Sequence, residues 1–259
     1  MTGSHTAGEL HAHGTLLWLD ARAKIVSLFA VVFVAVSTPA RAWQAFVVYW
    51  VLLTLYALAG MIPPRQILRR LLVVIPFLLL VLVFLPFMKP DFSRGEYWVS
   101  VGGFLMSSRS VDVLANVSTK SLTSVYALIL LSASTPFGDM LRGFERLRVP
   151  AVFVETVAFA WRYLFVLRDE AQRMLRARDA RAWRGRWVWQ VWVIGLMIGS
   201  LFLRAYERAE RVYQTMKARG YHGHSHTYFD KSMTRPDYGL VVMFAVVLAA
   251  TRIWVWRTL

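Results

Sequence analysis

Long apolar runs, separated by short polar or charged segments, make up most of this chain. A run that approaches 20 apolar residues is suited to a membrane-spanning helix. Such runs cover Ile25–Thr38, Trp43–Met61, Leu71–Met88 and Tyr238–Trp256, of which the first needs residues from both its ends. A further run, 111–134, is helical in pattern but carries Asp112 and Asn116, so we expect it to face protein rather than lipid. The pattern predicts an all-α integral membrane protein with about five transmembrane helices.

Basic residues at the ends of these runs predict the orientation of the helices. Arg65, Arg69 and Arg70 follow two prolines, and we expect them in a short cytoplasmic loop. This places a segment at 1–24 in the cytoplasm and a polar loop at 89–110 on the other side. Residues 1–23 lack a long apolar stretch, so we expect the first transmembrane helix of the 25–134 domain to act as the insertion signal.

The most informative stretch, 150–220, reads as two long helices in series. Each begins apolar and ends charged, and each closes on a similar tripeptide: Ala180-Arg181-Ala182 in the first helix and Ala218-Arg219-Gly220 in the second. Gly220 is a natural residue to end a helix. An arginine near a helix C-terminus is favoured by the helix dipole and presents a five-donor fork to a carboxylate. The tripeptides therefore predict two basic tips, although plain helix capping explains either one alone.

The second helix would be about 50 Å long, so the two tips can lie far apart. Gly195 and Gly199 give it a small-xxx-small surface that suits a close helix crossing. We expect residues 135–236 to form a cytoplasmic coupling domain of long crossing helices, and residues 237–259 to form the last transmembrane helix.

Composition agrees with a membrane protein, with 57% hydrophobic and 17% charged residues and a mean hydropathy of +0.47. The net charge of +15 suggests either a cytoplasmic basic face or nucleic-acid binding. The basic residues adjoin apolar runs, so we expect the lipid bilayer, and no nucleic acid, as the partner. The chain has no cysteine, which excludes disulfides and thiolate metal ligands.

The sequence contains no phosphate-binding loop, zinc-protease motif or nucleophile elbow. We therefore expect no catalytic residues and no cofactor, and any ATP must be hydrolysed by another subunit. Histidines occur in two polar segments, but without carboxylates in register, so no metal site is expected there; they are His11 and His13, and His222, His224 and His226. Glu155 and Arg162 are either the pathway of a carrier or polar residues that satisfy partners at helix crossings.

Three segments resemble a known family: Leu19–Lys24, the group Arg162-Tyr163-Leu164, and above all Glu210–Gly220. They are similar to the transmembrane T component of energy-coupling factor (ECF) transporters, in the CbiQ-like cobalt-uptake branch. That family carries an Ala-Arg-Gly motif at the end of each of two coupling helices. Here the second motif is intact, whereas Ala182 replaces the glycine of the first.

The resemblance implies a non-catalytic subunit of a multi-pass importer in a bacterial inner membrane. Its partners would be two ATP-binding cassette ATPase subunits, with Arg181 and Arg219 in their grooves, and a substrate-specific membrane subunit. It implies cobalt uptake for cobalamin biosynthesis, with nickel as the next candidate. A stand-alone secondary carrier, with Glu155 and Arg162 in its pathway, is the alternative.

Overall fold

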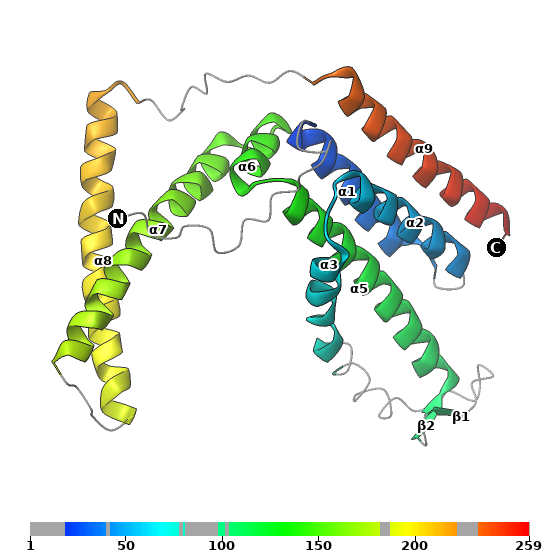
Figure 1. The fold of residues 1–259 in the computed structure, drawn as a ribbon, viewed down its shortest axis with the longest axis horizontal. Coiled ribbons are helices and arrows are strands. Elements are labelled where there is room, and N and C mark those ends of the chain that lie inside the picture. Colours follow the sequence, from blue (N-terminus) through cyan, green and yellow to red (C-terminus); the bar gives the residue numbers. More distant parts are fainter. Residues whose placement is uncertain are drawn as a thin grey trace. The chain divides into compact units, whose positions relative to one another are not determined.

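A computed structural model describes residues 19–39, 42–77, 80, 98–101, 104–181, 187–221 and 233–258 (Figure 1). The described residues are mostly helical. Their helices are α1 (Ala21–Ser37), α2 (Trp43–Ala59), α3 (Pro64–Leu72), α5 (Ser108–Ser134), α6 (Phe137–Arg146), α7 (Ala151–Ala180), α8 (Trp187–Ala218) and α9 (Arg235–Thr258). They divide into two compact units, one within Met1–Gly143 and Lys231–Leu259 and the other within Phe144–Asp230.

In the first unit, α1 packs against α5 and α9, and α2 packs against α5. The core between them is made of fully buried apolar side chains such as Leu28, Leu53, Leu130 and Phe244. Large apolar side chains also point outward, and Phe33 and Trp256 are 77% and 87% exposed. An outer surface this apolar suits lipid better than water.

By length and composition, one described helix can cross a membrane, at Arg235–Arg257. A second candidate is the pair Ala115–Ser134 and Phe137–Arg146, which bends by 106° at the break between its helices. The apolar helix Trp43–Ala59 is shorter than the usual span. The prediction of a span near the C-terminus is thus matched by α9, whereas the total of about five stays a prediction.

A buried polar clasp joins the N-terminal ends of α1 and α9. At the start of α9, the Thr234 backbone N–H and hydroxyl both donate to Asp237 Oδ2, at 2.7 Å and 2.6 Å. The other carboxylate oxygen, Asp237 Oδ1, accepts from the Asp20 backbone N–H at 2.7 Å. Asp20 in turn caps α1 by accepting from the Arg22 N–H at 3.0 Å. Each aspartate therefore caps its own helix, and Asp237 also holds the start of the other; we call this the Asp20–Asp237 clasp.

Lys24 lies one turn further along α1 and is 2% exposed. Its ammonium donates to the Ser134 carbonyl at the end of α5, at 3.1 Å. After Ser134 the chain turns sharply into α6, where Gly143 lies against α1. A Cβ at Gly143 would be 2.8 Å from Ile25 Cδ1 and 3.2 Å from Ala21 Cβ. The glycine allows α6 to approach α1 closely.

Three predictions in this unit were wrong in detail. Arg65, Arg69 and Arg70 lie on helix α3 rather than in a loop. The prolines before them start this helix, because Pro64 occupies a first-turn position where its missing N–H costs nothing. The run that begins at Leu71 is interrupted by a turn at residues 73–74, just before Pro76, which cannot donate a helical hydrogen bond. Within the segment predicted as a polar loop, β1 (Trp98–Val101) and β2 (Phe104–Ser107) form an antiparallel hairpin.

The second unit is built on α7 and α8, which contact each other and run in roughly opposite directions (Figure 1). Before α7 the chain makes an elbow at Arg148, whose φ of 68° is rare for a residue other than glycine. The Val149 N–H donates to the Phe144 carbonyl, and the Arg148 N–H donates to the Glu145 carbonyl. Pro150 then caps the start of α7.

Candidate functional site

The second predicted tip is a complete Schellman motif. Helix α8 ends at Ala218, and Gly220 adopts a φ of 84°. The Gly220 N–H donates to the Lys217 carbonyl at 3.0 Å, and the Tyr221 N–H donates to the Met216 carbonyl at 3.1 Å. These two bonds define the motif, and the positive φ favours glycine over any residue with a Cβ. Arg219 is therefore held at a fixed point, one residue beyond the helix.

The first predicted tip ends differently. Helix α7 ends at Ala180, and Arg181 has a φ of −81°, so no left-handed residue is needed at this position. Its N–H donates to the Arg178 carbonyl at 3.2 Å. Beside it, the Arg178 guanidinium forms an ion pair with Asp179 at 2.8 Å. Ala182, which stands in the place of the family's glycine, lies outside the described residues.

The Arg181 and Arg219 side chains are both exposed. Among the residues that the structure describes, neither guanidinium makes a hydrogen bond or an ion pair. Each therefore offers its full set of donors to an external acceptor. A facing carboxylate could take two of these donors at once, which is the strongest arrangement available to an arginine.

Tyr221 links the second tip to α7. Its phenol donates to Glu155 Oε2 at 2.5 Å, and this bond to a carboxylate raises the pKa of Tyr221. Glu155 is the fifth residue of α7 and was considered in the sequence as a pathway or crossing residue. The structure assigns it a partner 66 residues away. Sequence reasoning missed Tyr221, although an apolar contact is common at its position, directly after the glycine of a Schellman motif.

An apolar groove of about 440 Å³ lies between the first half of α7 and the second half of α8. Its lining includes the aromatic rings of Phe159 and Tyr163 on α7, the side chains of Val212 and Met216 on α8, and Tyr221. The groove shows that the two helices are not packed tightly along this part of their length.

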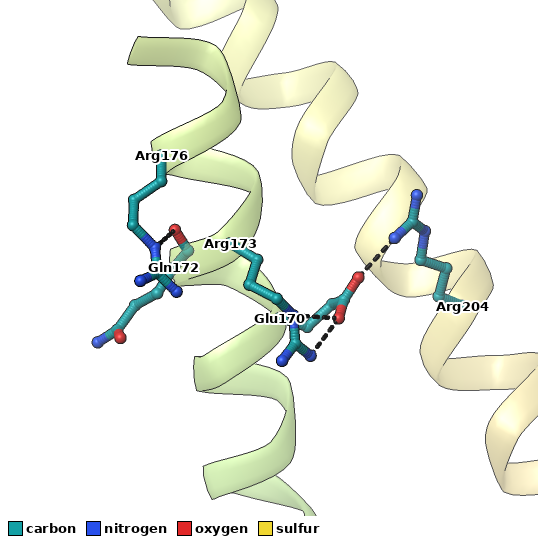
Figure 2. Close-up of polar contacts among 5 residues, drawn as sticks. All are labelled: Glu170, Gln172, Arg173, Arg176 and Arg204. Atoms are coloured by element: carbon teal, nitrogen blue, oxygen red, sulfur yellow. Dashed lines mark hydrogen bonds and ion pairs between the residues drawn. The ribbon is translucent and has the colours of Figure 1, made fainter. Parts of the chain in front are cut away.

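Figure 2 shows the polar contact that joins α7 to α8 at another point. Glu170 on α7 accepts from Arg173 on the same helix at 2.5 Å, and from Arg204 on α8, also at 2.5 Å. Arg173 first, and then Arg204, lower the pKa of the Glu170 carboxyl. By helical spacing alone, Arg204 falls on one face of α8 with Glu207 and Arg211. Those two do pair, at 3.8 Å, but Arg204 turns to α7 instead.

The remaining predicted residues are not gathered at one place. Gly195 and Gly199 are exposed, and a Cβ on either would meet no described atom within 4 Å. The close helix crossing predicted there is therefore not made within the described part of the chain. Arg162 is exposed on α7. The five loop histidines lie outside the described residues, and the described residues hold no cluster of three acidic or histidine side chains suited to a metal.

Comparison with known proteins identifies the family of this chain. The family model described as CbiQ, cobalt transport protein, matches residues 16–229. The chain is 34% identical over 125 residues to the cobalt transport protein CbiQ of Rhodobacter capsulatus, covering 46% of this chain and 50% of that protein. It is 28% identical over 136 residues to the nickel permease LarQ of Lactiplantibacillus plantarum, covering 50% of each.

Over a longer match of 216 residues, it is 23% identical to the energy-coupling factor transporter transmembrane protein EcfT of Listeria innocua, covering 79% of this chain and 80% of that protein. The match spans only half the length of the CbiQ and LarQ relatives. The family model, in contrast, matches most of this chain, from residue 16 to residue 229, and this range includes Arg181 and Arg219. The chain therefore belongs to the CbiQ family of cobalt transport proteins.

Proposed function

We propose that this chain is the coupling (T) subunit of an ECF-type importer, with residues 135–236 as its coupling domain. The observation that carries the proposal is the pair of exposed arginines, Arg181 and Arg219, each placed at the C-terminal end of a long helix. The printed name of the Listeria innocua relative, an energy-coupling factor transmembrane protein, supports the same role.

The tips would bind two ATP-binding cassette ATPase subunits, one tip in each. The chain itself carries no phosphate-binding loop, so nucleotide chemistry belongs to those partners. Each arginine would enter an acidic groove and form charge-assisted hydrogen bonds. When the ATPases close on ATP, the two grooves approach each other, and α7 and α8 shift relative to one another. A groove and an exposed ion pair between the helices leave room for such a shear.

The cargo would be a divalent metal ion, Co²⁺ first and Ni²⁺ second. The family description names cobalt, and the Lactiplantibacillus plantarum relative is a nickel permease. A substrate-specific membrane subunit would capture the ion, and this chain would pass the ATPase motion to it. The complex would lie in a bacterial inner membrane, with this chain crossing the membrane several times.

Charge reversal tests the tips. Arg219→Glu and Arg181→Glu should each weaken co-purification of the ATPase subunits, and the double variant should lose them. Arg168→Glu is the matched control, because Arg168 is an exposed arginine within α7 and away from both tips. Retention of the ATPases, with normal ATP turnover, in the double variant would refute the proposal.

A stand-alone carrier is separated from this proposal by reconstituting the purified chain alone in vesicles. The coupling role predicts no uptake of Co²⁺ or Ni²⁺ until ATPase subunits and ATP are added. Uptake driven by an ion gradient in the chain alone would establish the carrier.

A further inference from the structure

The two tips engage α7 at its opposite ends. Arg181 directly follows the last residue of α7. Arg219 directly follows the last residue of α8, and Tyr221, two residues later, is hydrogen-bonded to Glu155 in the second turn of α7. From Glu155 to Arg181 the helix extends for about 40 Å at 1.5 Å per residue. A force on Arg181 therefore acts on the C-terminal end of α7, and a force on Arg219 acts, through Tyr221, on its N-terminal end.

We propose that Tyr221 and Glu155 are positioning residues that tie the second tip to the start of α7. The inference rests on the proposed function and specifies how motion at Arg219 is transmitted. As the two ATPase grooves approach, Arg181 would carry one end of α7 and the Tyr221–Glu155 bond would carry the other. The helix would then turn as a lever, instead of being displaced at one end only.

The tie is stiff because each part of it is restrained. The Schellman motif fixes the backbone of Tyr221 through its bond to the Met216 carbonyl. The ring lies among the apolar side chains of the groove, and a tyrosine has only two side-chain torsions to restrain. The phenol ends on a carboxylate, which makes the hydrogen bond charge-assisted.

The position of Glu155 also matters for where the motion goes. It lies seven residues after Arg148, the left-handed residue of the α6–α7 elbow. A pull on Glu155 therefore enters the chain near the first residue of α7, a few residues after a left-handed backbone position. A small shift applied there can rotate α7, because the point of attachment lies close to one end of the helix.

The experiment uses the whole complex, purified with the ATPase and substrate-capturing subunits that accompany the chain and reconstituted in vesicles. Uptake of Co²⁺ or Ni²⁺ is measured per ATP hydrolysed. Tyr221→Phe and Glu155→Ala should lower this ratio about tenfold, the factor expected for one lost hydrogen bond to a charged group, with the ATPases still bound. The double variant should be no worse than either single variant, and Glu155→Gln, which keeps an acceptor oxygen, should restore coupling.

Tyr213→Phe is the matched control. Tyr213 lines the same groove, but its hydroxyl makes no hydrogen bond with a described residue, so coupling should stay at the wild-type level. Wild-type coupling in Tyr221→Phe would overturn the positioning role, and so would loss of the ATPases in that variant. The proposed function is judged separately, by the release of the ATPases from Arg219→Glu.

A distance measurement tests the tie without relying on transport. Spin labels are attached to cysteines introduced at two exposed positions, Ala158→Cys on α7 and Gln214→Cys on α8. The chain has no cysteine of its own, so the labels react at these two positions alone. The label-to-label distance distribution should be narrow in the otherwise unchanged protein and in Tyr213→Phe, and should broaden in Tyr221→Phe. An equally narrow distribution in Tyr221→Phe would overturn the inference even if that variant transported poorly.

Discussion

Removing the Asp237 carboxylate should open the clasp that joins α9 to α1. Asp237 is fully buried, and it accepts from the Asp20 N–H and from both the N–H and the hydroxyl of Thr234. The Thr234 groups are at an exposed position and can turn to water in Asp237→Ala. The Asp20 N–H is buried and loses its acceptor. The three hydrogen bonds to Asp237 therefore do not contribute equally to the expected loss of stability.

The expected loss of stability follows from the buried environment of the Asp20 N–H and the exposed environment of Thr234. A buried donor left without an acceptor costs about 1–3 kcal/mol. Loss of the two hydrogen bonds from Thr234 at the start of α9 costs about 1 kcal/mol more. Asp237→Ala should thus lower the free energy of unfolding by about 2–4 kcal/mol. Asp237→Asn should fall in the same range, since its amide presents donors to a site that supplies donors.

The assay is reversible unfolding in detergent micelles, followed by far-ultraviolet circular dichroism. Asp139→Asn is the control, because Asp139 also lies in the first turn of a helix but is 56% exposed and forms an exposed ion pair with Arg142 at 3.8 Å. It should change the free energy of unfolding by less than about 1 kcal/mol. If Asp237→Ala were no more destabilising than this control, the buried hydrogen bonds would not be what holds α9 to α1.

Three further predictions concern helix contacts and ends. The pKa of Glu170 is lowered in the folded chain, so its ion pair with Arg204 stabilises the fold above the ordinary carboxyl pKa. This stabilisation is lost as the pH falls through the lowered pKa. In Glu170→Gln, thermal unfolding midpoints measured against pH should lack this acid-dependent loss. Arg148→Gly should raise stability by up to about 1 kcal/mol, because relief of about 1–2 kcal/mol of left-handed strain exceeds the entropy cost of glycine, and a lower thermal midpoint would contradict this. Gly143→Val should cost about 1–3 kcal/mol by overpacking α6 against Ile25, and denaturant titration against Gly143→Ala, the smaller change, would measure it.

Local signals predicted the ends of the long helices well. Gly220 marks the end of α8 because only a residue without a Cβ enters the left-handed region at low cost. The change from apolar to charged residues along α7 and α8 indicated long helices, and both are continuous over the predicted stretches. A local signal is also available for α3, because Pro64 is favourable at the start of a helix, although the arginines that follow it were expected in a loop.

Contacts between distant residues could not be predicted in the same way. Helical periodicity places Arg204 on one face of α8 with Glu207 and Arg211. Its ion pair with Glu170, however, depends on how α7 packs against α8. Tyr221 finds Glu155 across 66 residues, and Asp237 finds Asp20 across 217. No spacing rule within one helix reaches so far, because i,i+3 and i,i+4 neighbours are the only pairs that helical geometry brings together.

The clasp has a consequence for the order in which this chain can fold. One of its aspartates precedes the first described helix and the other begins the last, with the whole of the second unit between them. During synthesis, the Asp20 N–H at the start of α1 therefore lacks its final acceptor until the ribosome has made both α7 and α8. The first unit closes only when α9 arrives, so a chain truncated before α9 would leave a buried face of α1 uncovered and open to degradation.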